Sequence, residues 1–147
     1  MRVTVIRDPS LTSRQRRVVA QARLGALLRA CGDRLELGSR TSFCVRLTGD
    51  IELRDLNARF LGVDAPTDVI AFPSDDPGRV GDVAISVERA VAQSSDGAAE
   101  LRLLAVHGLL HCLGHDHDEP GPAMRMTALT RTLLPGAEIP ELEVAGV

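Results

Sequence analysis

Apolar and polar positions alternate at the start of the chain and then change to a helical spacing. Val3 and Val5 alternate with polar residues in MRVTVIRD, which is the period of a half-buried strand. Apolar residues then recur at helical spacing, and Ser10 or Ser13 is expected to cap a helix that ends near Cys31. The start of the chain therefore predicts a strand followed by one long helix.

The middle of the chain predicts three more strands and a short helix. One strand is expected over residues 42–48, SFCVRLT, and a short helix begins at Asp50. The apolar runs VIAF, residues 69–72, and DVAIS, residues 82–86, predict two further strands, and most residues between them are turn formers. So short a connection favours antiparallel pairing of these two strands.

The pattern becomes mainly helical after the last predicted strand. A helix is expected to begin near Val87 and to break at Asp96 and Gly97, and an apolar helix then follows over residues 98–113. Residues 116–122, DHDEPGP, are expected to form a loop. The last part of the chain therefore brings a long apolar helix directly before a polar loop.

A closing helix is predicted over residues 124–134, and the proline-containing acidic tail from about residue 135 is expected to be poorly ordered. Without an internal repeat or a linker, residues 1–147 are expected to form a single domain. We predict an α+β fold, in which a small mixed, mostly four-stranded sheet packs with about five helices.

Composition narrows the class of protein further. The chain is 44% hydrophobic and 25% charged, with a net charge of −3, which is typical of a globular protein. Only 2% of the residues are aromatic, so aliphatic side chains must build the core and few rings are available for base stacking. The three widely spaced cysteines and the lack of a signal peptide or membrane-length segment predict a cytoplasmic protein with no membrane partner.

All four histidines of the chain lie in one segment, HGLLHCLGHDH. On a helix, His107 and His111 lie about 40° apart around the axis and about 6 Å apart along it, so their imidazoles point the same way. Gly114 can adopt the left-handed conformation that ends a helix, which would bring His117 back to this pair. We therefore predict one metal site formed by His107, His111 and His117, on a helix and the loop that follows it.

Two neighbours compete with these ligands. If the helix ran on, His115 would lie about 12 Å from His107, and Cys112 is turned about 100° from the histidine face. Both are weaker candidates, and Cys112 is expected to be a small buried apolar residue. Gly108 stands where H-E-x-x-H peptidases have their glutamate, which disfavours peptide hydrolysis by that mechanism. A glycine inside a helix indicates that another backbone or a substrate approaches closely there, or that the helix packs against a neighbouring element.

Three imidazole ligands without a thiolate suit one zinc ion, and nickel or copper would also bind in vitro. Three protein ligands leave the fourth coordination position to water, which is the arrangement of a catalytic rather than a structural zinc site. The residues alone therefore indicate a metal-dependent hydrolase.

The histidine segment resembles the H-G-x-L-H-x-x-G-x-D-H signature of the YbeY family of bacterial metal-dependent endoribonucleases. Three upstream blocks resemble further family motifs in the family's order: Leu56 with Asn57, PTDVIAFP over residues 66–73, and GDVAIS over residues 81–86. The resemblance extends over residues 44–134. It implies a zinc-dependent endoribonuclease specific for single-stranded RNA.

The same resemblance implies ribosomal RNA or the small ribosomal subunit as partner. It further implies involvement in maturation of the 3′ end of small-subunit ribosomal RNA and in ribosome quality control. The sequence leaves the catalytic residues and the oligomeric state open.

One position departs from the family pattern. Where the family has an aromatic residue, arginine and glycine, this chain has Phe60, Leu61 and Gly62, so an arginine of the family's active site is missing. On a helix Arg59 lies about 200° from position 61 and is not an automatic substitute. A guanidinium can stabilise the charge that develops on a phosphodiester, so its loss is expected to reduce catalytic power more than metal binding.

Three polar residues are secondary candidates, as groups that orient a ligand or contact the substrate. Asp116 is interpreted as orienting a ligand imidazole or capping the turn. Thr67 and Asp68 precede an apolar strand, where a structural role in capping or turn formation is the favoured interpretation.

Two other functions remain open. The first is an RNA-binding factor for ribosome assembly with a structural metal and weak or lost cleavage activity, which Leu61 favours. The second is a metal hydrolase with a peptide or small-molecule substrate. An arginine-lined groove leading to the ion would favour RNA over that second alternative.

Overall fold

A computed structural model describes residues 1–144 of the chain. Along this part, four strands and six helices follow one another. In chain order they are β1 (Arg2–Arg7), α1 (Ser13–Ala22), α2 (Leu24–Arg34), β2 (Ser42–Thr48), α3 (Asp50–Leu61), β3 (Val69–Pro73), β4 (Arg79–Ser86), α4 (Val87–Gln93), α5 (Gly97–Cys112) and α6 (Pro120–Leu133). Among residues 1–144, none of the helices combines the length and the apolarity needed to cross a membrane.

The strands form one mixed sheet in the order β1-β2-β4-β3. β1 with β2, and β2 with β4, are parallel pairs, whereas β3 and β4 are antiparallel. The antiparallel pair is the one predicted from the short connection between the two strands. The predicted α+β class with a mixed four-stranded sheet is confirmed.

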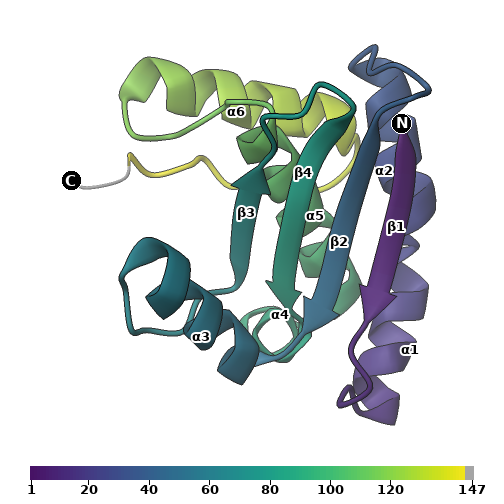
Figure 1. The fold of residues 1–147 in the computed structure, drawn as a ribbon, viewed down its shortest axis with the longest axis vertical. Coiled ribbons are helices and arrows are strands. Elements are labelled where there is room, and N and C mark those ends of the chain that lie inside the picture. The colour runs from purple at the N-terminus through teal and green to yellow at the C-terminus, as the bar shows by residue number, and fades with distance from the viewer. Residues whose placement is uncertain (145–147) are drawn as a thin grey trace.

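Alternate residues of the strands pack on opposite faces of the sheet. Val83 and Ile85 of β4 belong to the main core, whereas Ala84 packs in a smaller cluster with Leu53 of α3 and Ile70 of β3. Figure 1 shows α1, α2 and α5 behind the sheet and α3 at the lower end of β3. Since both faces are covered by apolar contacts, a slip of one residue in any central strand would expose buried side chains.

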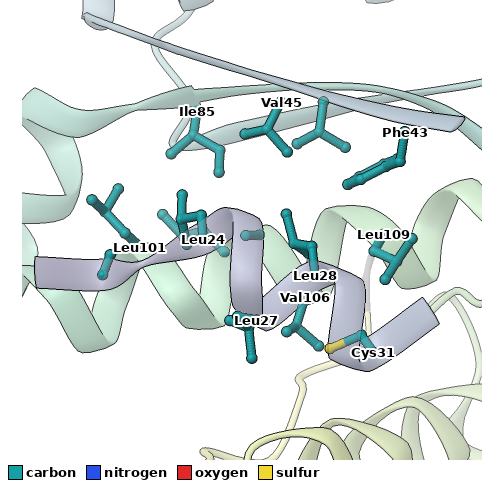
Figure 2. Packing of buried hydrophobic residues seen from close by; sticks show 14 of the residues in the cluster. Leu24, Leu27, Leu28, Cys31, Phe43, Val45, Ile85, Leu101, Val106 and Leu109 are labelled. Carbon is teal, nitrogen blue, oxygen red and sulfur yellow. The ribbon is translucent and has the colours of Figure 1, made fainter. Parts of the chain in front are cut away.

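The main core is built mostly from aliphatic side chains, many of them from the sheet, α2 and α5. Phe43 and Val45 of β2 point towards Leu28 of α2 and Leu109 of α5 (Figure 2), and all four are at most 1% exposed. Each such side chain contributes about 1.5–3 kcal/mol relative to an exposed position. Helix α5 is therefore held firmly against both the sheet and α2.

The first helical region differs from the prediction of one long helix. It is interrupted at Arg23, whose φ and ψ of 49° are left-handed, so α1 and α2 are separate helices. The cap is Thr12 and not Ser10 or Ser13. The Thr12 hydroxyl accepts a hydrogen bond from the Gln15 backbone, and the Gln15 side chain accepts one from the Thr12 backbone. Threonine followed three residues later by glutamine is the sequence pattern of a capping box. The prediction missed it because the two serines nearby are equally good capping residues.

The closing helix α6 begins at Pro120, so the loop predicted over residues 116–122 is too long. Proline is favoured in the first helical turn, where its missing N–H has no partner to lose.

The tail after α6 has no regular secondary structure over residues 138–144, yet Ile139 and Leu142 pack against the main core. The expectation of poor order from about residue 135 also covers residues 145–147, which lie outside the described part of the chain.

Candidate metal centre

Helix α5 carries the first two histidines and is fixed by its packing. Its N-terminal cap is Asp96, whose carboxylate accepts a hydrogen bond from the Ala99 backbone at 3.0 Å. On its sheet side, a Cβ atom added to Gly108 would lie only 2.7 Å from Cγ1 of Val83 in β4. Gly108 therefore allows the helix backbone to approach the sheet closely, and this packing sets the position of the flanking histidines.

The C-terminal end of α5 reverses the chain. Gly114 has a φ of 93°, its N–H donates to the carbonyl of His111 at 3.0 Å, and the N–H of His115 donates to the carbonyl of Leu110 at 3.0 Å. These two bonds form the Schellman motif of helix ends. The left-handed turn predicted at Gly114 is present, and the chain after it returns towards the helix.

This turn brings the three predicted ligands together. One ring nitrogen from each of His107, His111 and His117 lies within 4.8 Å of the other two. The Nε2 atoms of His107 and His111 are 2.8 Å apart, and the ring centroid of His117 is 5.5 Å from each of the other rings. Zinc–nitrogen bonds of about 2.0–2.1 Å at tetrahedral angles separate the nitrogens by about 3.3 Å. The group can hold one metal ion after small side-chain movements.

The two competing residues are elsewhere. Within residues 1–144, the three histidines form the one cluster of histidine, cysteine or acidic side chains at metal-binding spacing, and it does not include His115 or Cys112. The thiol of Cys112 points to β4, 3.9 Å from the carbonyl oxygen of Asp82, and burial raises its pKa to about 11. This thiol stays protonated and packs against the core as a small apolar group, as predicted, although Cys112 is half-buried and not fully buried.

Burial keeps the helix-borne imidazoles neutral. Burial, assisted by the nearby His111 and His117, lowers the pKa of His107 to about 4. Burial also lowers the pKa of His111, although the carboxylate of Asp116 acts in the opposite direction. Since a metal ion binds the neutral imidazole, both residues have the required protonation state at neutral pH.

The histidines form one side of an open cleft of about 600 Å³. Strand β3 lies along it, and Leu61, at the end of α3, lies on the other side. The three secondary candidates, Thr67, Asp68 and Asp116, all line the cleft as well. Within the described part of the chain no arginine lines it, so the arginine-lined groove that would have favoured RNA is not found.

The secondary candidates differ in their hydrogen bonds. The carboxylate of Asp116 accepts a bond from the backbone N–H of His117 at 2.7 Å, which places it at the turn before the third ligand. The carboxylate of Asp68 accepts a bond from the Gln93 side chain at 3.1 Å. The Thr67 hydroxyl is 3.4 Å from a backbone carbonyl, which makes at best a weak bond.

Position 61 faces the cleft, and the arginine two residues earlier does not. Leu61 is 62% exposed at the last turn of α3, which ends at the left-handed Gly62 with a φ of 70°. Arg59 instead forms an ion pair with Asp55, one turn back on α3, at 3.2 Å. Position 61, where the resemblance implies an arginine, therefore lines the histidine cleft, whereas Arg59 is engaged with Asp55.

One contact of the centre was not predicted. Nδ1 of His117 lies 3.0 Å from the backbone carbonyl oxygen of Glu143, in the C-terminal tail. A backbone carbonyl is present at every residue, so no sequence signal marks this one.

Comparison with known proteins places the chain in a family. A family model described as Endoribonuclease YbeY matches residues 11–137. The Endoribonuclease YbeY of Chloroflexus aggregans is 46% identical over 95 residues, which cover 54% of this chain and 61% of that protein. The Gloeobacter violaceus protein of the same name is 39% identical over 119 residues, covering 71% of this chain and 61% of its own length. This chain thus spans less than two thirds of the length of these two relatives.

A third relative, the Endoribonuclease YbeY of Moorella thermoacetica, is 36% identical over 130 residues, covering 77% of this chain and 83% of that protein. The solution structure of TM1509 from Thermotoga maritima has the same fold, with a TM-score of 0.51 and 20% identity over 92% of this chain and 99% of that chain. Taken with the match over residues 11–137, these similarities show that the chain belongs to the Endoribonuclease YbeY family.

Proposed function

We propose that this protein is a zinc-dependent endoribonuclease that cleaves single-stranded RNA, with His107, His111 and His117 as the metal ligands. The observation that carries the proposal is the approach of three ring nitrogens to within 4.8 Å of one another beside an open cleft. RNA as the substrate is supported by family membership, because the relatives are named as endoribonucleases. The cleft itself contributes no arginine to that argument.

The chemistry follows from the side chains that line the cleft. Zinc bound at the three histidines would supply a Lewis acid and lower the pKa of water. His107 and His111 are neutral in the fold and would offer their Nε2 lone pairs. Asp68 and Asp116 are the carboxylates that line the cleft, so they are our candidates for accepting a proton or binding a ribose hydroxyl.

We place the biological substrate in the cytoplasm, as the three widely spaced cysteines predict. The family resemblance implies which RNA this is and which process its cleavage serves. The target would be the 3′ end of small-subunit ribosomal RNA, with a role in ribosome quality control. Residues 1–147 would act in this as a single metal-dependent hydrolase domain.

One observation favours a second candidate, an RNA-binding factor for ribosome assembly whose cleavage is weak. Leu61 lines the cleft where the family pattern has arginine, and no other arginine of the described residues takes that place. A missing guanidinium removes charge stabilisation from the cleavage transition state while RNA binding elsewhere is unaffected.

The test compares zinc-loaded wild type with His111→Ala and with the matched control His115→Ala, on single-stranded and duplex RNA of one sequence. We expect cleavage of the single strand by wild type and by His115→Ala, and none by His111→Ala. Equal cleavage by all three proteins would contradict a metal-dependent reaction at these histidines. Binding of RNA without cleavage by wild type would favour the assembly factor.

A further inference from the structure

We propose that residues 138–143, here called the strap, position His117 for metal binding through the backbone carbonyl of Glu143. The inference rests on the proposed metal site and adds to it a segment outside the histidine motif. The strap crosses from the end of α6 back to the histidine cleft, where its last residue contacts the third ligand. Figure 1 shows this part of the chain, in yellow, running beside α6 towards β3.

The contact selects one tautomer of the imidazole. A carbonyl oxygen can only accept a hydrogen bond, so at 3.0 Å from Glu143 the Nδ1 atom of His117 must carry the proton. The lone pair of the neutral ring then lies on Nε2. Ligand histidines ordinarily donate their other ring N–H to a carbonyl or carboxylate, and this fixes both the tautomer and the orientation of the ring.

His117 needs such support more than the other two ligands. His107 and His111 stand on the buried helix α5, whereas His117 lies in the irregular segment between Gly114 and Pro120. A side chain on such a segment samples several rotamers, and binding an ion would have to order it. The bond to Glu143 orders the ring before the ion arrives, which is preorganisation.

The strap is itself anchored to α6 and the core. The N–H of Leu142 donates to the Thr127 hydroxyl at 3.3 Å, and that hydroxyl donates to the Ala123 carbonyl at 2.9 Å. Arg131 donates to the carbonyl of Ile139 at 3.4 Å. The side chains of Ile139 and Leu142 pack against the main core. These anchors hold Glu143 at a fixed distance from the cleft.

Packing beneath the strap is incomplete. A cavity of about 190 Å³ separates its residues Ile139, Pro140 and Leu142 from Leu104 and His107 of α5. The strap is therefore held by a few specific contacts, and loss of one should release it measurably. By linkage, a docked strap that strengthens metal binding must itself be stabilised by the metal to the same extent.

The first test is Thr127→Val in the full chain, which removes the acceptor for Leu142 while keeping the size of the side chain. Thr130→Val is the matched control, since Thr130 lies on the same helix, is 3% exposed against 5% for Thr127, and its hydroxyl donates to Met126. Zinc affinity is measured by chelator competition. We expect about a tenfold loss in Thr127→Val, and less than a twofold change in the control.

Leu142→Asp should release the strap more completely and weaken zinc binding by about 10–100-fold. Two further measurements report on positioning rather than on folding. Nitrogen NMR of metal-free wild type should show the His117 ring with its proton on Nδ1, and Leu142→Asp should lose this preference. Hydrogen exchange of the Leu142 amide in wild type should slow in zinc by the same factor by which Leu142→Asp weakens affinity.

The outcomes separate the two proposals. Unchanged zinc affinity in both Thr127→Val and Leu142→Asp, with one zinc still bound, would overturn the role of the strap and leave the metal site intact. Equal losses in Thr127→Val and Thr130→Val would also overturn it, because the effect would then come from α6. A wild type that binds no zinc would overturn the metal site, and the strap's role with it.

Discussion

The two sides of the cleft present side chains of different chemistry. On one side, α5 and the turn after it present three histidines whose ring nitrogens lie within 4.8 Å of one another. On the other side, the last turn of α3 presents Leu61, which is 62% exposed and carries no charge. The three histidines and position 61 belong to separate elements of this fold, so one can be substituted while the other is kept.

The two sides also differ in how deeply their residues are buried. Leu109 and Leu110 of α5 are fully buried and Gly108 packs directly on β4, so a change near the histidines disturbs the core. Phe60 and Leu61 lie at an exposed helix end, where a substitution disturbs little. We expect substitutions on the histidine side to affect metal and stability together, and substitutions at position 61 to affect the rate of cleavage alone.

The largest expected effect is the loss of a ligand. His111→Ala should reduce zinc affinity about a thousandfold or more, because the remaining two histidines cannot complete the site. Metal content after dialysis and chelator competition would measure this, with His115→Ala as the control that keeps one zinc. If His117→Ala kept a full equivalent of zinc while His115→Ala lost it, the third ligand would have been assigned wrongly.

The next effect concerns pH and the histidine side. In the folded protein the pKa of His107 is about 4, whereas in the unfolded chain it has its ordinary value of 6.5. Between pH 6.5 and 4, the unfolded chain therefore takes up a proton at His107 and the folded protein does not. Stability from this group is therefore complete above pH 6.5, is lost as pH falls towards 4, and does not change further below that. The loss in the free energy of unfolding is about 3 kcal/mol at most.

Denaturant unfolding of the metal-free protein across this pH range would measure the slope. His107→Gln should flatten it, because glutamine does not titrate. A wild type whose stability is constant between pH 6.5 and 4 would show that His107 is more exposed to water than its position indicates.

The α3 side is tested by Leu61→Arg. A guanidinium at the rim should raise the single-turnover rate of RNA cleavage by about 10–100-fold, by stabilising charge on the phosphodiester, with metal content unchanged. Arg59→Ala is the companion variant, and we expect it to cleave at the wild-type rate since Arg59 pairs with Asp55. A large loss in Arg59→Ala would mean that Arg59 acts in catalysis, and three equal rates would mean that no arginine of this block does.

The smallest effect is expected from Gly108→Ala. Its methyl group would lie 2.7 Å from Val83, and such overpacking costs about 1–3 kcal/mol, of which about 1 kcal/mol is offset by the better helix propensity of alanine. Denaturant unfolding should therefore show a loss of at most about 2 kcal/mol. In the control Gly121→Ala the added atom meets only the flexible end of Arg125, at 3.4 Å, and no loss is expected.

Much of the fold could be predicted from the sequence because its signals are local. The strand over residues 42–48 follows from alternation within itself, and the antiparallel pair follows from a short turn between two apolar runs. The two wrong predictions, an unbroken helix through Arg23 and a loop that includes Pro120, also concern local structure. At both positions the sequence is compatible with two local structures. A left-handed arginine has no clear sequence signal, and a proline can belong either to a loop or to the first turn of a helix.

The sequence by itself predicted that the three histidines form one group, since the spacing of His107 and His111 and the turn at Gly114 depend only on the geometry of one helix and its end. Only the tertiary structure decided what surrounds them. Leu61 and the histidines line one cleft because α3 and α5 both pack against β3, which runs along that cleft. Glu143 reaches His117 because the tail packs back on the core. Such contacts join residues far apart in the chain, so they depend on how the whole core packs and leave no periodic pattern in the sequence.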